Sequence, residues 1–330
     1  MILRKSILCG IFIAFWGMVQ AQQIGCTVYD SASTDIPDNL IKTIAVDATN
    51  KLWFATGDCF YGGKLVSFDG QKFTSYDSTN SGMYDKFITA IAFDSENNMW
   101  LGTRYSGIYF YDGHNWLNYN LTNAPLPDPH ITSIAIEKPA AGGKEIIWFS
   151  TDKGLVSFNG TDWTVFNKKQ IGITDDVVYW VAVDASGTKW IASSCGFASY
   201  DGKNWKVYNT SNSRLPNNQV NHVFTDERTG ILWVDYWGGL ISVQGDVWTI
   251  YTPDNSGIPK YCDYKIHVDN DGLLWIATNN GLVLFDGTSW KSFTPMNSCN
   301  PSFFVNKVIT DHSNRHWAAT QDGLMMFNKK

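Results

Sequence analysis

The chain has 330 residues, of which 44% are hydrophobic and only 17% are charged, and its formal net charge is -6. The apolar content supplies a large core and excludes a disordered chain. The negative charge and the lack of a Lys/Arg cluster exclude sequence-independent binding to nucleic acid, which needs a cationic face. Aromatic residues reach 15%, with 15 Trp, 15 Tyr and 19 Phe, which indicates that a repeated pattern places large rings.

The first predicted element is a secretory signal peptide at residues 1–21. Arg4 and Lys5 make a basic start, an apolar run follows, and small residues surround a cleavage site after Ala21. The apolar run is too short to span a bilayer. Cleavage removes two positive charges and no acid, so the mature net charge becomes -8. We therefore expect a periplasmic or secreted protein without a transmembrane segment, whose single domain covers residues 22–330.

From residue 26 onward the chain repeats with a period of 42 residues. Seven tryptophans stand in the same local context, at spacings of 47, 48, 42, 43, 42 and 42: Trp53, Trp100, Trp148, Trp190, Trp233, Trp275 and Trp317. Each departure from 42 coincides with an insertion in a turn. Every repeat holds short runs with period-two alternation between turn residues, which is typical of β-strands. Four strands per repeat predict a propeller blade.

The seventh repeat stops after its third strand, and its fourth strand is expected at the other end of the chain. The segment Thr27-Val28-Tyr29 matches Lys206-Val207-Tyr208, and Tyr29 precedes Trp53 by 24 residues, a spacing found in four other repeats. The N-terminal strand would then complete blade seven and remove the open sheet edges that invite aggregation. The predicted fold class is all-β, a seven-bladed propeller closed by its N-terminal strand.

The repeat resembles the two-component regulator propeller repeat over residues 26–330. The shared pattern is Trp-x-Ala/Gly-Thr, then Gly-Leu, then Asp-Gly-x-x-Trp, with connectors rich in Asn, Ser and Pro. The resemblance implies an exported sensor propeller of the kind found in hybrid histidine kinases, often with a glycan as its ligand. Because this chain carries no kinase and no transmembrane helix, we do not expect it to signal directly.

Most of the repeated polar residues have a structural interpretation. The seven tryptophans are interpreted as packing between blades. Six aspartates end the first strands and are expected to cap hairpin turns rather than bind calcium, because the distal Glu of a calcium loop is absent: Asp47, Asp94, Asp184, Asp226, Asp269 and Asp311. The six histidines show no zinc-binding pattern. We therefore expect no metal and no cofactor.

Five cysteines follow the signal peptide: Cys26, Cys59, Cys195, Cys262 and Cys299. Export permits disulfides, and an odd count leaves at least one thiol free or intermolecular. The sequence leaves their pairing open, and single buried thiols are an equal alternative.

Blade five breaks a rule that the other blades keep. The residue two positions after the tryptophan is small in six blades but is Asp235 in this one. Larger polar residues on neighbouring first strands replace the Thr, Ala and Ser of the early blades: His222, Lys265, His267 and Lys307. A buried carboxylate needs a partner, so a structural ion pair is favoured over a ligand-binding or catalytic group.

The turns between second and third strands are expected to form one mouth of the propeller. Planar polar groups and aromatic rings alternate there, a combination that suits a sugar, whose C–H face stacks on rings while its hydroxyls need polar partners. The candidate ligand-binding residues are Arg104, Tyr105, Asp152, Asp235, Tyr236, Trp237 and Asn279.

These observations favour a non-enzymatic, exported, monomeric propeller that binds a glycan or a peptide at this mouth, with no assigned catalytic residue. One alternative is a metal-dependent lyase similar to the streptogramin B lyases, in which His222 or His267 would act with Asp235. The other alternative is a scaffold that binds a protein partner.

Overall fold

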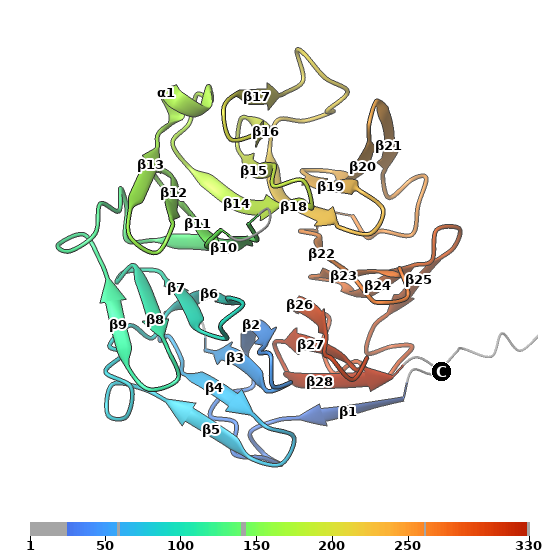
Figure 1. The fold of residues 1–330 in the computed structure, drawn as a ribbon. Coiled ribbons are helices and arrows are strands. Elements are labelled where there is room, and N and C mark those ends of the chain that lie inside the picture. Colours follow the sequence, from blue (N-terminus) through green and yellow to red (C-terminus); the bar gives the residue numbers. More distant parts are fainter. Residues whose placement is uncertain (1–24, 58–59, 140–142, 261, 329–330) are drawn as a thin grey trace, which may run out of the picture.

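Seven four-stranded antiparallel sheets surround a central axis in the computed structural model, which describes residues 25–57, 60–139, 143–260 and 262–328 (Figure 1). In six sheets the strands follow one another in sequence order from the axis outward, and in the seventh the N-terminal strand takes the outermost place. The predicted fold class, an all-β seven-bladed propeller with four strands per blade, is confirmed. The signal peptide and Cys59 lie outside the described residues.

The first four blades occupy the N-terminal half of the chain. Blade 1 contains β2 (Ile41–Val46), β3 (Leu52–Thr56), β4 (Leu65–Phe68) and β5 (Phe73–Tyr76). Blade 2 contains β6 (Ile88–Phe93), β7 (Met99–Thr103), β8 (Ile108–Tyr111) and β9 (Trp116–Tyr119). Blade 3 contains β10 (Ile131–Glu137), β11 (Ile146–Thr151), β12 (Gly154–Phe158) and β13 (Trp163–Phe166). A one-turn helix, α1 (Lys168–Ile171), precedes blade 4, which contains β14 (Val178–Val183), β15 (Lys189–Ser193), β16 (Gly196–Tyr200) and β17 (Trp205–Tyr208).

The remaining blades follow the same plan. Blade 5 contains β18 (Val220–Asp226), β19 (Ile231–Tyr236), β20 (Gly239–Gln244) and β21 (Val247–Tyr251). Blade 6 contains β22 (Lys265–Val268), β23 (Leu274–Thr278), β24 (Gly281–Phe285) and β25 (Trp290–Phe293). Blade 7 contains β26 (Val305–Thr310), β27 (His316–Thr320), β28 (Gly323–Asn328) and, from the N-terminus, β1 (Gly25–Tyr29).

Blade 7 closes the ring in the predicted way. Strand β1 pairs antiparallel with β28, with Tyr29 opposite Leu324. A disulfide then joins Cys26 of β1 to Cys299 in the connector before β26, across a sequence separation of 273 residues. The two ends of the ring are therefore held by a strand pair and by a covalent bond. Cys195 and Cys262 are free thiols.

The repeated tryptophans pack against neighbouring blades, as expected. Six of them are only 1% to 6% exposed, and each belongs to a hydrophobic cluster that contains residues of an adjacent blade: Trp53, Trp100, Trp148, Trp233, Trp275 and Trp317. Trp190 differs, because its side chain is partly exposed at the boundary between blades 4 and 5. Trp190 lines a cavity between these two blades.

The aspartates that end the first strands cap turns, and they also hold the tryptophans. In blade 1, one oxygen of Asp47 accepts the backbone N–H groups of Thr49 and Lys51, and the other accepts the Trp53 indole N–H at 2.9 Å. The indole bond recurs in blades 2, 4, 6 and 7, and Glu137 makes it in blade 3. In blade 5 the inserted residue places Asp226 seven positions before the tryptophan, and its carboxylate binds Thr229 instead.

Candidate functional site

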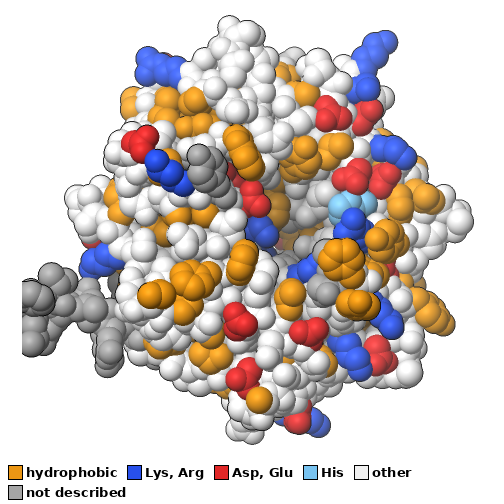
Figure 2. Space-filling model, turned by 180° about the vertical axis from the view of Figure 1, so that it is seen from behind, with side chains coloured by type: hydrophobic (Ala, Val, Ile, Leu, Met, Phe, Trp, Pro, Cys, Tyr) orange, Lys and Arg blue, Asp and Glu red, His pale blue; other side chains and the backbone are white. Residues whose placement is uncertain are grey.

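The mouth of the propeller is formed by the turns between second and third strands and by the connectors between blades. Most of the exposed large rings lie in these segments: Phe60, Tyr61, Tyr84, Tyr105, Trp237, Phe303 and Phe304. Figure 2 shows a face of the ring on which hydrophobic and charged side chains gather around a central hollow. Single exposed hydrophobic residues are common on protein surfaces, whereas a set of aromatic rings on one face is typical of interaction surfaces.

Two of the candidate residues lie together in blade 2. The Arg104 guanidinium is 5.6 Å from the centre of the Tyr105 ring, and both side chains are exposed. The Tyr105 backbone N–H donates to Asp85 at 3.0 Å, and its ring meets Phe87 edge to face at 5.2 Å. The turn is therefore fixed while its planar cation and ring remain open to a ligand.

In blades 3 and 6 the candidates have different surroundings. Asp152 is 2.8 Å from the Nδ1 atom of His130, and the adjacent Lys153 forms an ion pair with Asp128 at 3.1 Å. These contacts hold the turn of blade 3 to the connector from blade 2. Asn279 is exposed in the turn between β23 and β24.

Blade 5 presents only one of its three candidates on the open face. Trp237 is 54% exposed, whereas Asp235 and Tyr236 are 1% and 4% exposed and lie below the surface. Tyr236 occupies the position that is a buried Thr or Ser in the other six blades, and it packs in the cluster that contains Phe197 and Val220. Burial raises the pKa of the Tyr236 hydroxyl.

The large polar residues of blades 4 to 7 occupy equivalent register positions on the innermost strands. Trp180, His222, Lys265 and Lys307 each lie opposite the residue two positions after the blade tryptophan. In blades 1 to 3 the same layer holds the smaller Thr43, Ala90 and Ser133. Three of the four substitutions noted in the sequence, His222, Lys265 and Lys307, therefore lie at equivalent positions in neighbouring blades.

Asp235 does not form the expected ion pair. Within the described part of the chain, its Oδ2 atom accepts the Tyr264 backbone N–H at 3.3 Å, while Oδ1 has no hydrogen-bond partner. Burial raises the pKa of this carboxyl well above its usual value. His267 lies further along β22, and its Nε2 atom is 2.8 Å from the Thr310 hydroxyl oxygen. The expectation of an Asp235 ion pair with Lys265 or His267 is therefore wrong, because among the described residues no cation lies within ion-pair distance of the carboxylate.

His222 is the cross-strand neighbour of Asp235 and is buried against the Trp180 ring, at 4.0 Å between ring centres. Burial and then the positive charges of Lys265 and Lys307 lower the pKa of His222 to about 3, so the imidazole is neutral at pH 7. Its Nδ1 atom has no hydrogen-bond partner in the described chain. Among these residues, no group of three or more His, Cys, Asp or Glu side chains is placed to hold a metal.

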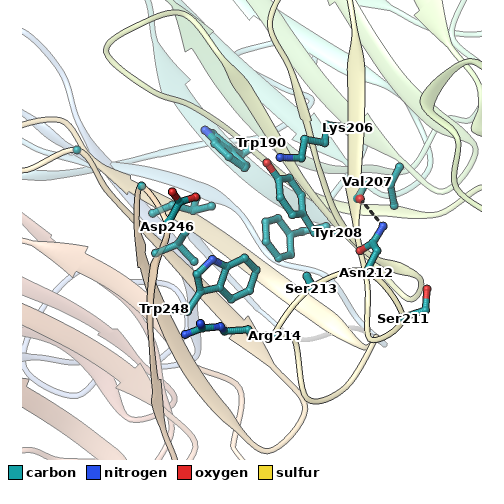
Figure 3. A pocket seen from close by; sticks show the side chains of 15 residues that line it. Trp190, Lys206, Val207, Tyr208, Ser211, Asn212, Ser213, Arg214, Asp246 and Trp248 are labelled. Carbon is teal, nitrogen blue, oxygen red and sulfur yellow. Dashed lines mark hydrogen bonds between the residues drawn. The ribbon is translucent and has the colours of Figure 1, made fainter.

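A cavity of about 850 Å³ lies between blades 4 and 5, outside the predicted mouth. Figure 3 shows the Tyr208 ring between those of Trp190 and Trp248, with Lys206, Arg214 and Asp246 around them. This cavity was not predicted from the sequence. One signal was present: Val243 stands where the third strands of the other blades carry an aromatic residue.

Many solved structures are similar in fold to this chain. The extracellular domain of BT3049, described as a hybrid two component system of B. thetaiotaomicron, is 19% identical, with a TM-score of 0.74 over 92% of this chain and 42% of its own. An inactive virginiamycin B lyase from Staphylococcus aureus with quinupristin is 12% identical, with a TM-score of 0.72 over 93% and 100% of the two chains. YCF48 bound to D1 peptide is 14% identical, with a TM-score of 0.66 over 94% and 96%.

At these identities the likeness shows the fold alone, and this chain spans less than half the length of the BT3049 domain. No curated protein sequence matches. Across the described residues, no helix has the length and apolar character needed to cross a membrane. Residues 85–105 match the model of the family described as two component regulator propeller. The predicted resemblance is therefore confirmed: this chain is a seven-bladed propeller, and its residues 85–105 match the two component regulator propeller repeat.

Proposed function

We propose that this chain is an exported, non-enzymatic ligand-binding propeller of the sensor type, and that it binds carbohydrate at its mouth. The observation that carries the proposal is the set of exposed rings and planar polar groups on the mouth, with Arg104, Tyr105 and Trp237 among them. Exposed rings offer flat apolar surfaces to the C–H face of a sugar, and the guanidinium and amide groups offer hydrogen bonds to its hydroxyls.

Two further observations support a binding role. The chain is similar in fold to an extracellular domain of a two component system and to a propeller that binds a peptide. The side chains of Tyr105 and Trp237 are 58% and 54% exposed, so they contribute little to the core. Large exposed rings without a packing role are typical of binding surfaces.

Trp237→Ala is expected to weaken carbohydrate binding at the mouth by roughly 5- to 30-fold, because a stacked ring contributes about 1 to 2 kcal/mol of affinity. The melting temperature is expected to stay near that of the wild type. A glycan array followed by calorimetric titration of the strongest ligand measures the affinity, and a thermal melt measures stability. Leu117→Ala is the matched control, since Leu117 is 50% exposed but lies on the outer strand β9.

The outcomes separate the possible roles of the mouth. A lower melting temperature with unchanged affinity would show that Trp237 contributes to packing and not to ligand binding. If the mouth binds a peptide but no oligosaccharide, the carbohydrate proposal is wrong and the ligand is a peptide or protein.

We also propose that residues 1–21 are removed on export and that residues 22–330 form the mature domain. Expression of the full chain in a bacterial host with a periplasm is expected to yield a protein whose N-terminal sequence starts at Gln22. The disulfide between Cys26 and Cys299 supports this compartment, because disulfides persist in oxidising environments. An intact N-terminus in the purified periplasmic fraction would contradict the proposal.

A further inference from the structure

The blade 5 outer hairpin lacks an aromatic pair that five other blades share. In those blades the third strand and the fourth strand each carry a ring at the same cross-strand position, and the ring centres are 4.1 to 4.6 Å apart. The corresponding pair in blade 5 is Val243 and Trp248. Trp248 is thus without the stacked partner that every one of these five blades provides.

The missing ring leaves room between blades 4 and 5. The nearest rings to Trp248 are Phe197 and Tyr208 of blade 4, at 5.9 and 6.3 Å between centres. Val243, Trp248 and the partly exposed Trp190 all line the cavity of about 850 Å³. The exposure of Trp190, which is unique among the seven equivalent tryptophans, has its cause in this same space.

Charged side chains stand at the rim of the cavity. Lys206 on β17 lies with its ammonium 4.7 Å from the centre of the Tyr208 ring, Arg214 follows in the connector, and Asp246 lies in the turn between β20 and β21. All three are exposed, and within the described residues none of them forms an ion pair. Their hydrogen-bonding groups are therefore available to a bound molecule (Figure 3).

We propose that this interblade cavity is a second carbohydrate site, separate from the mouth, in which a pyranose ring takes the place of the missing aromatic side chain against Trp248. A sugar has an apolar C–H face for the rings and hydroxyls for the guanidinium, ammonium and carboxylate groups of the rim. An aromatic side chain of a peptide would stack equally well, but it would leave these charged groups without partners.

The proposal is tested by Val243→Tyr, which restores the ring pair found in blades 2 and 4, where Tyr111 and Tyr200 stack on Trp116 and Trp205. The variant is expected to fill the cavity, to keep or raise the melting temperature, and to weaken binding at this site by roughly tenfold or more, because the ligand and the new ring compete for one surface of Trp248. A panel of neutral and acidic oligosaccharides is the probe, with calorimetric titration of each hit.

The test uses the double variant Tyr105→Ala/Trp237→Ala as background, so that failure at the mouth and failure at this cavity are seen separately. Trp248→Ala is expected to lose binding, whereas Trp290→Ala, the equivalent residue of blade 6 stacked on Phe285, is expected to lose stability but not binding. Oligosaccharide binding that survives Val243→Tyr in this background overturns the proposal. Absence of any oligosaccharide hit in this background, or a hit only with an aromatic peptide, also overturns it.

Discussion

Replacement of both Cys26 and Cys299 by serine is expected to lower the free energy of unfolding by about 5 kcal/mol. The disulfide spans 273 residues, so it closes almost the whole propeller into one covalent loop and restricts the unfolded chain strongly. It also holds β1, which reaches blade 7 from the opposite end of the sequence and pairs with β28 alone. Chemical denaturation of the oxidised wild type and of the double variant measures the difference.

Cys195→Ser is the matched control, because Cys195 is a partly exposed free thiol in blade 4. It is expected to leave the denaturation midpoint close to that of the wild type, both with and without reductant. If the Cys26→Ser/Cys299→Ser protein were as stable as the control, the ring would be held by the pairing of β1 with β28, and the disulfide would add nothing to closure.

Closure of the ring was predictable because the repeat has a fixed length. Tyr29 lies 24 residues before Trp53, as the last ring of a blade does elsewhere, and the structure indeed places β1 in blade 7. The cysteine pairing was not predictable from the same arithmetic. Cys26 lies opposite Phe327, at the position where other blades carry the second ring of the aromatic pair, and only the folded connector brings Cys299 to it.

The mouth was harder to predict than the fold, because a residue that departs from the repeat can point inward or outward. Tyr236 stands where other blades have a buried Thr or Ser, and counting from the tryptophan predicts burial at this position. Trp237, one residue later, alternates to the open face. The cavity between blades 4 and 5 depends on a ring that is absent, and the small Val243 is less conspicuous in the sequence than an added charged or aromatic side chain.

For the substitutions on the innermost strands, the repeat pattern likewise predicted the positions but not the contacts that the side chains make. His222, Asp235, Lys265 and Lys307 were visible as departures from the small residues of the early blades, and an ion pair was the expected explanation. In the structure Lys265 and Lys307 form no ion pair within the described residues, and their pKa values are lowered by burial. A partly buried cation without an ion-pair partner costs stability. Lys265 and Lys307 are therefore expected to destabilise the folded protein while they are charged.

Lys307→Met is accordingly expected to raise the free energy of unfolding at pH 7 by about 2 kcal/mol. Burial and the charge of Lys265 lower the pKa of Lys307 to about 8 from 10.5, so the folded protein holds this proton less tightly than the unfolded chain. Between these pH values the unfolded chain keeps the proton and the folded protein loses it, so wild-type stability gains with rising pH. Lys307 is only partly buried, so solvent screens its charge. The expected change in the free energy of unfolding is therefore smaller than the full pKa shift would give.

Denaturation of the wild type and of Lys307→Met from pH 7 to pH 10.5 measures this difference. The gap between the two proteins is expected to be largest at pH 7 and to shrink as Lys307 loses its proton. Lys203→Met, on the exposed turn between β16 and β17, is the control and is expected to change stability little at any pH. A Lys307→Met protein that is less stable at pH 7 would show that the ammonium has a stabilising partner in the channel.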